Sequence, residues 1–483
     1  MLKKRLLFSI LCLLLSGVSF GQSSSMSVNQ KQLLLKQAIK MLKKTKAAMQ
    51  VNFNAQVDED EKKSWDEIVG NLTHQQVVIE NDLNPVGILT NSSKMLPIKE
   101  YFFGVQTRYQ PRGLSFNISF EEAKVLFKNQ TDVFIYARKY MQGTWHLNGY
   151  EDKEVIRNYD YCRIVLRVEA ANQESLKIAY IDNDLSEINA ATSVESFSTA
   201  LSDRTLEDMV EKIVNDLSLK IPKSETKEIN IQKVSYQGKG IINSFSHLFT
   251  GQLKAMLLCT HRNLKVTLPV RSIYRVLTLN SSYTVEGNEL EVNVNLVDSL
   301  GHEVVNSSYK ILIDTKSEWA NGLVPKEAYV ATNNVLTNVI KETPDNYDIK
   351  KLQFEVRTNK GSAPQSFREG EELSLYVIAN RPCRVRIIYK DAVDSLFFMN
   401  NSDFQITASQ TNIPQPLKER FLCSAPFGVE AIIGFATTGS FEQLNIREKG
   451  GLHYLIDPIE KLRDKSAGSQ TVQRMVQITS YPK

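Results

Sequence analysis

Residues 281–313, SSYTVEGNELEVNVNLVDSLGHEVVNSSYKILI, decide how the middle of this chain folds. Apolar and polar residues alternate along three short runs within this stretch, which is the pattern of half-buried β-strands. The runs are separated by residues 286–288 (EGN) and 298–301 (DSLG), and short segments of this composition connect antiparallel strands. The stretch therefore predicts a meander of three antiparallel strands, and it carries no residue that we would assign to catalysis.

Helices and strands alternate on the N-terminal side of this meander. Apolar residues at helical spacing between Leu206 and Leu217 predict a helix, for which Asp203 is the expected N-cap. Strands are expected at residues 229–236 and 264–268, with a helix at residues 245–258 between them.

Residues 203–345 resemble the TolB N-terminal-like domain. The segments that carry the resemblance are 282–287 (SYTVEG) and 296–304 (LVDSLGHEV). Flagellar and curli outer-membrane assembly proteins, and lipoprotein activators of penicillin-binding proteins, look similar over this span. Known members are adaptors and assembly factors, so the resemblance implies contact with other envelope proteins. The family usually has a further helix before the first meander strand, whereas only residues 269–275 are available here.

The N-terminus has the layout of a cleavable secretory signal. Three basic residues at positions 3–5 precede an apolar core at 6–15, and small residues follow up to Gly21. We expect a signal peptide at residues 1–22 and a periplasmic or secreted protein. No cysteine stands next to the expected cleavage point, which disfavours a lipid anchor, and no later stretch is long and apolar enough to span a membrane.

The overall charge argues against nucleic acid as a partner. Loss of the three basic residues of the signal lowers the formal net charge from +4 to +1, whereas binding to phosphates requires a clearly basic surface. Apolar residues make up 42% of the chain and charged residues 23%, which is ordinary for globular proteins. The length predicts about three domains.

A basic amphipathic helix is expected at residues 27–50, within a leading segment at 23–62. It could attach to an anionic surface, or it could be the first helix of a domain with a solvated basic face. The acidic run at residues 58–61 follows at once and would cancel much of the local field, which favours the second interpretation. We expect this acidic run to be exposed to solvent.

Residues 63–184 predict an α+β domain. Helices are expected at 65–76 and 98–109, and five strands are expected between residues 114 and 182. The order of helices and the segment 77–85 (VVIENDLNP) resemble the nuclear transport factor 2-like cone. Enzymatic versions of that fold place an Asp and a His inside the cone. Asp160 and His146 are the candidates here, although an alternating strand would turn them outward just as readily.

Residues 185–202 are poor in large apolar residues and predict a linker, and residues 346–483 predict a β-rich domain of short strands at sandwich-like spacing. This last domain resembles domain of unknown function 4384 in three segments, which are 367–373 (FREGEEL), 396–400 (LFFMN) and 425–430 (APFGVE). That family usually has a proline before the final Asn of the second segment, where Met399 stands here. No activity comes with the resemblance.

No catalytic, metal or cofactor site can be argued from the sequence. A G-x-S-x-G pattern at residues 17–21 falls in the expected signal peptide, and the six histidines are scattered without the spacing of metal ligands. Cys383 and Cys423 lie in the same expected domain, so a disulfide between them is a candidate. Both have apolar neighbours, which equally suits buried free thiols.

The sequence therefore predicts a multi-domain α+β chain with a cone-like first domain, a mixed α/β TolB-like middle domain and an all-β sandwich-like last domain. The expected function is that of a non-enzymatic envelope adaptor that binds other proteins and needs no cofactor. One alternative is a small-ligand receptor or enzyme that uses the cone. A second is cell-wall glycan binding, for which Trp145, Tyr150 and Tyr159 are stacking candidates, although aromatic residues on strands more often belong to the core.

Overall fold

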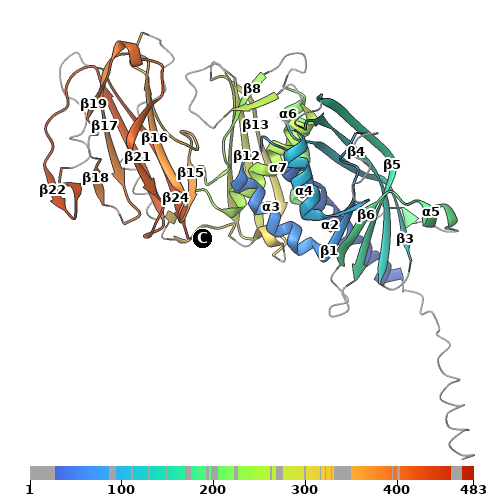
Figure 1. The fold of residues 1–483 in the computed structure, drawn as a ribbon. Coiled ribbons are helices and arrows are strands. Elements are labelled where there is room, and N and C mark those ends of the chain that lie inside the picture. Colours follow the sequence, from blue (N-terminus) through green and yellow to red (C-terminus); the bar gives the residue numbers. More distant parts are fainter. Residues whose placement is uncertain are drawn as a thin grey trace, which may run out of the picture.

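The computed structural model has mixed α and β structure in which strands predominate (Figure 1). It describes residues 28–85, 94–109, 112–128, 131–147, 151–168, 176–191, 195–196, 205–221, 227–261, 264–267, 276–298, 301–330 without 316, 321 and 328, 350–399 without 394, 403–457 and 470–482. The expected signal peptide lies outside these residues. No helix among them is long and apolar enough to cross a membrane.

A seven-stranded sheet forms the first part of the fold. Its strands are β1 (Thr73–Glu80), β2 (Met95–Pro97), β3 (Ser115–Phe127), β4 (Asp132–Trp145), β5 (Lys153–Val168), β6 (Leu176–Asp182) and β7 (Glu195–Ser196), in the order β2-β1-β6-β5-β4-β3-β7. The pairing is antiparallel except between β1 and β6. β7 lies within the expected linker and extends the sheet beside β3, and the linker also contains a short helix, α5 (Ser186–Ala190).

Three helices pack on this sheet, namely α2 (Val28–Phe53), α3 (Glu59–Leu72) and α4 (Ile98–Arg108). The sequence placed the second helix at residues 65–76, which is wrong at both ends. It begins at residue 59 because Asp58 caps it, and it ends before Thr73 because the next residues pair with β2 and β6. α2 is a core helix, as its buried Ala38, Leu42 and Ala48 show, so residues 27–50 are the first helix of a domain.

The meander is confirmed as β11 (Leu277–Glu286), β12 (Glu289–Val297) and β13 (Glu303–Leu312). Gly287 begins the turn between β11 and β12 with a φ of +60°, which glycine adopts without a steric penalty. The rest of this sheet is formed by β8 (Lys227–Ile231), β9 (Ser235–Tyr236) and β10 (Leu264–Thr267), and β8 lies between β10 and β11.

Two helices, α6 (Leu206–Ser218) and α7 (Ser244–Thr260), accompany the second sheet. The N-cap of α6 is Thr205 and not the expected Asp203, because Thr205 and Asp208 form a reciprocal capping box. Residue 203 lies outside the described residues, as does most of a helix that the sequence predicts at residues 317–341. A short 3-10 helix, η2 (Glu318–Ala320), stands near the start of that segment.

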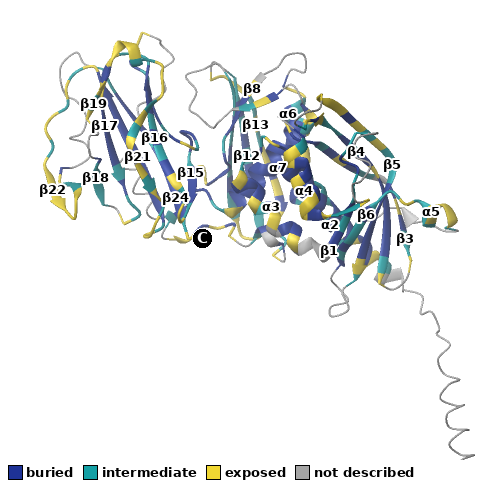
Figure 2. Cartoon of the chain, viewed as in Figure 1, coloured by how far each residue is buried: buried dark blue, intermediate teal, exposed yellow. Residues whose placement is uncertain are grey.

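The helices form the layers between the two sheets (Figure 1). α7 contacts α2, α3 and α6, and one continuous hydrophobic core extends from α2 to η2 and also includes residues of the C-terminal part, among them Ile388 and Phe435. No separate core therefore marks the boundary that the sequence predicts near residues 185–202. Figure 2 shows buried residues concentrated along α2 and α7.

The C-terminal part consists of two sheets packed on a shared core. One sheet has the order β14-β16-β20, and the other has the order β15-β24-β21-β17-β18-β23-β22, with β19 also paired to β17. The bounds are β14 (Phe354–Thr358), β15 (Gln365–Arg368), β16 (Glu372–Ala379), β17 (Cys383–Lys390), β18 (Leu396–Phe398), β19 (Phe404–Ile406), β20 (Gln415–Leu422), β21 (Val429–Thr437), β22 (Ile446–Lys449), β23 (Leu452–Leu455) and β24 (Thr471–Tyr481). The sequence did not anticipate β15, β20, β22, β23 or β24.

Candidate functional site

The acidic run at the start of α3 is folded into a capping box. The Asp58 carboxylate accepts a hydrogen bond from the Glu61 backbone N–H at 2.9 Å, and the Glu61 carboxylate accepts one from the Asp58 N–H at 3.3 Å. Both carboxylates lie at the positive end of the helix dipole. The expectation that this run is solvated holds for Glu59, whose side chain is 78% exposed, and is wrong for Asp60 and Glu61, which are 7% and 0% exposed.

Lysines from the second sheet and from α7 form ion pairs with two of these carboxylates, Asp58 and Glu61. On α7, Lys254 Nζ lies 2.6 Å from Glu61 Oε1 and 3.5 Å from Asp58 Oδ2. Lys233, which follows β8, places its Nζ 3.7 Å from Asp58 Oδ2. Both lysine side chains are buried. Solvent therefore screens the pair of Lys254 with the buried Glu61 little, whereas the pairs with Asp58 are partly screened because its side chain is 42% exposed.

The C-terminal domain completes the cluster. Lys360 Nζ lies 2.8 Å from Asp60 Oδ2 and 2.7 Å from Glu371 Oε2. On the same side, His247 Nε2 of α7 lies 2.6 Å from Ser366 Oγ. We call the residues Asp58, Asp60, Glu61, Lys233, His247, Lys254 and Lys360 the junction cluster. It connects α3, the second sheet with α7, and the C-terminal domain.

The surroundings shift the pKa values of the junction cluster in different directions. Burial opposes ionisation of Asp58, but Lys233 and Lys254 outweigh it and hold the pKa of Asp58 well below its usual range. Burial likewise opposes ionisation of Asp60, and Lys360 reverses the effect and lowers its pKa. Burial raises the pKa of Glu61 to about 7, against the attraction of Lys254.

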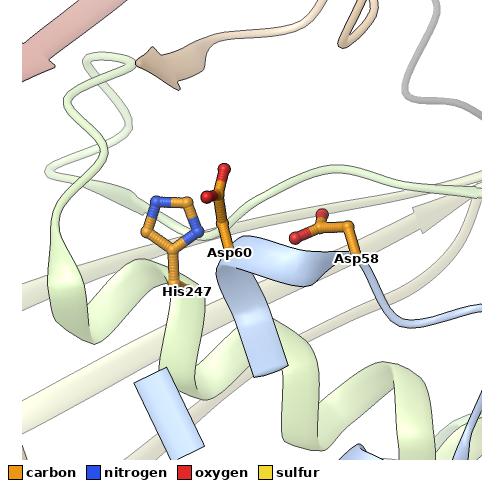
Figure 3. A group of neighbouring side chains, drawn as sticks. All are labelled: Asp58, Asp60 and His247. Carbon is orange, nitrogen blue, oxygen red and sulfur yellow. The ribbon is translucent and has the colours of Figure 1, made fainter. Parts of the chain in front are cut away.

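Asp58, Asp60 and His247 are the residues of this cluster that could hold a metal ion. One ligand atom from each lies within 4.8 Å of the others, and their side chains project from the start of α3 and from α7 (Figure 3). The donor set does not suit a cation, because three ammonium groups already stand at the carboxylates and would repel a divalent ion. Burial and Lys233 also lower the pKa of His247 to about 3. The arrangement fits an ionic connection between domains better than a metal centre.

A second buried ionic group lies in the first sheet. Asp82 accepts hydrogen bonds from Lys139 Nζ at 2.5 Å and from the Tyr101 hydroxyl at 2.7 Å. The Lys139 side chain is 3% exposed and that of Asp82 is 6% exposed. This pair fixes the turn after β1 on β4 and α4, and it is closed to solvent.

The candidates for the cone cavity do not come together inside the sheet. Asp160 is exposed on β5, and His146 is exposed just after β4. His146 pairs with Asp152 at 2.5 Å between Nδ1 and Oδ1. The alternation of the strands turns Asp160 outward, and Asp82 and Lys139, which are not among the sequence candidates, form a buried ionic pair in this domain.

The described candidates for sugar stacking are not arranged as a glycan-binding surface. Trp145 is 0% exposed, so its ring cannot receive a sugar. Tyr159 is partly buried, and Lys139 Nζ lies 5.1 Å from the centre of its ring. Tyr150 lies outside the described residues.

The candidate disulfide does not form in this structure, because Cys383 and Cys423 are both free thiols. Cys383 is buried on β17 in the core of the C-terminal domain. The Cys423 thiol lies 3.6 Å from the Phe367 carbonyl oxygen, to which it donates a weak hydrogen bond.

Sequence reasoning missed the polar residues of α7. The helix sequence SFSHLFTGQLKAMLLCT is apolar on nearly every side, and a helix of that kind lies inside a protein. His247, Gln252 and Lys254 therefore had to be buried, and buried polar groups require partners or ligands. This signal was present in the sequence.

No protein-family model and no curated protein matches the chain. Among solved structures, the LpoB C-terminal domain from Salmonella enterica matches with 10% sequence identity. The match covers 23% of this chain and 99% of that domain, with a TM-score of 0.19. A likeness at this level does not show a shared fold.

Proposed function

We propose that the protein is a non-enzymatic adaptor of the cell envelope that binds another protein along the edge of β13. The observation that carries the proposal is the position of this strand. β13 is ten residues long and ends its sheet within the part of the chain that the structure describes. An edge strand offers backbone donors and acceptors to which an extended partner segment can add.

The side chains of β13 suit this role. Asn306 and Ser308 are exposed and uncharged, and the strand has no proline that would interrupt pairing. The edge strand β20 differs, because Pro416 lies near its start and Lys418 and Arg420 are exposed along it. Proline and basic residues protect edges against pairing. β13 has no proline and one exposed basic residue, Lys310, so it is the more receptive of these two edges.

The element order supports identification of the middle domain as TolB N-terminal-like. The helix α6, the strand β8, the helix α7 and the strands β10 to β13 follow one another as that resemblance implies. The two-sheet arrangement at the C-terminus is compatible with the sandwich-like domain proposed for residues 346–483. The proposed location in the periplasm or outside the cell rests on the signal-like residues 1–22.

Site-specific photo-crosslinking in intact cells tests the proposal. A photoreactive amino acid at Asn306 or Ser308 should yield the same crosslinked partner protein, which mass spectrometry would identify. The matched control is the probe at Lys418 on β20, which is also exposed and should not yield that partner. Equal crosslinking from all three positions, or none from β13, would rule out this edge as the binding surface.

A further inference from the structure

Two neighbouring cavities lie in the seam between β3 of the first sheet and the helices α2, α6 and α7. Their volumes are about 420 and 390 Å³. Five residues line both cavities, namely Lys46, Gln50, Asn117, Glu211 and Met256. We treat them as one groove and call it the seam groove. It is separate from the junction cluster and from the edge of β13.

Two buried amide side chains line this groove without satisfying their hydrogen bonds. Gln252 of α7 is 0% exposed, and within the described part of the chain neither its Oε1 nor its Nε2 has a partner. Gln50 of α2 donates from Nε2 to the Phe116 carbonyl at 3.1 Å, while its Oε1 has no partner there. A buried amide without partners is destabilising, so these two amides point to a ligand that would satisfy them.

The charges of the groove are of both signs. Lys43 and Asp208 neutralise each other at 2.6 Å. Among the described residues, neither Lys46, which is half-buried, nor Glu211, which is exposed, has an ion-pair partner. Glu207 is buried at the groove, and burial raises the pKa of its carboxyl. A cation from a ligand would offset that unfavourable burial.

We propose that the seam groove binds a short peptide whose amino and carboxyl termini are both free. A peptide group offers one donor and one acceptor, which complements the amide of Gln252 and the carbonyl oxygen of Gln50. The peptide carboxylate suits Lys46, and the peptide ammonium suits Glu211 or Glu207. A neutral sugar would leave these charges without a partner, and a polyanion would meet three carboxylates. The inference does not depend on the proposed adaptor function.

Isothermal titration calorimetry on the full chain at low salt tests this assignment. The probe is the dipeptide Ala-Ala, compared with its N-acetylated, C-amidated form and with N-acetylglucosamine. We expect binding of Ala-Ala alone. Removal of one charge-assisted contact by Lys46→Met should weaken binding about tenfold or more. Lys36→Met, at an exposed position of the same helix, is the control and should bind like the wild type.

Gln252→Met separates a ligand-binding role from a structural one. Because the Gln252 amide has no partner among the described residues, the substitution should leave the melting temperature of the ligand-free protein unchanged or raise it, while Ala-Ala binding weakens about tenfold. Absence of Ala-Ala binding, equal binding of the blocked dipeptide or the sugar, or a Lys46→Met variant that behaves like Lys36→Met would each overturn the proposal. Photo-crosslinking from β13 should be unaffected by all three substitutions, so the two proposals fail independently.

Discussion

Substitution of Glu61 by glutamine should change how the stability of the protein depends on pH. Burial raises the pKa of Glu61 from its ordinary value of 4.5 to about 7, Lys254 opposes the rise, and Asp58 adds to it. Between these pH values the folded protein keeps a proton that the unfolded chain releases. The free energy of unfolding therefore falls as pH rises from about 4.5 to about 7 and levels off above pH 7. The difference between the two pKa values corresponds to a total loss of about 3 kcal/mol.

His247 contributes with the opposite sign over part of the same range. Burial and Lys233 lower the pKa of His247 to about 3 from an ordinary value of 6.5. Between these values the unfolded chain binds a proton that the folded protein does not, so stability rises with pH. The two contributions partly cancel between pH 4.5 and 6.5 in the wild type. The diagnostic quantity is consequently the difference in unfolding free energy between Glu61→Gln and the wild type.

That difference can be measured by urea unfolding at half-unit pH steps from 4.5 to 8. Tryptophan fluorescence reports on this region, because Trp65 of α3 is buried and donates a hydrogen bond to the Leu248 carbonyl of α7 at 3.0 Å. The stability of the variant relative to the wild type should rise by about 3 kcal/mol across the range. Glu59→Gln is the control, because the Glu59 side chain is 78% exposed. A difference that stays flat, or that falls with pH, would mean that Glu61 is ionised throughout and would refute the reasoning.

Three further outcomes follow from the packing. Lys360→Met removes the ammonium that bridges the C-terminal domain to α3, and it should lower the free energy of unfolding by about 2 kcal/mol. This is less than the loss of a fully buried pair, because Lys360 is 24% exposed. Limited proteolysis should release the C-terminal domain sooner from this variant than from Lys360→Arg. Gly434→Ala would place a methyl group 2.2 Å from Val356 Cγ2, and a melting temperature lower by several degrees, from strain of about 1–3 kcal/mol, is expected. Cys383 and Cys423 should both be recovered as free thiols in a non-reducing peptide map, and recovery of a peptide pair linked through them would contradict the structure. Before denaturation both thiols should react slowly with alkylating reagents at pH 8, because burial raises the pKa of each to about 11.

The elements that the sequence predicts well are those with local signals. β11, β12 and β13 appear where apolar and polar residues alternate, and the turn at Gly287 stands where the sequence places it. α7 occupies residues 244–260 against an expected 245–258. In each of these cases the periodicity and the turn residues lie within the element itself, so no distant contact is needed to specify it.

The junction cluster could not be predicted in the same way, because its pairs are formed by residues far apart in the chain. The partner of Glu61 is 193 residues away and that of Asp60 is 300 residues away. An isolated run of four acidic residues is ordinarily solvated, and only the fold brings the lysines to it. The same limit applies to β20, which pairs with β16. Its proline and three charged residues are not typical of a strand, so the sequence does not predict it.

Ionic contacts at the junction constrain the C-terminal domain differently from an apolar contact. An apolar surface gains free energy without regard to direction, whereas Lys360 must keep both Asp60 and Glu371 within hydrogen-bonding distance. Gly240 adds a steric condition, because it has a φ of +76° and a Cβ there would lie 2.5 Å from Gln477 Oε1 of β24. Together these contacts favour the orientation of the domain relative to α3 and α7 that the structure has. An adaptor that binds its partner along β13 would hold its C-terminal domain in a fixed direction from that partner.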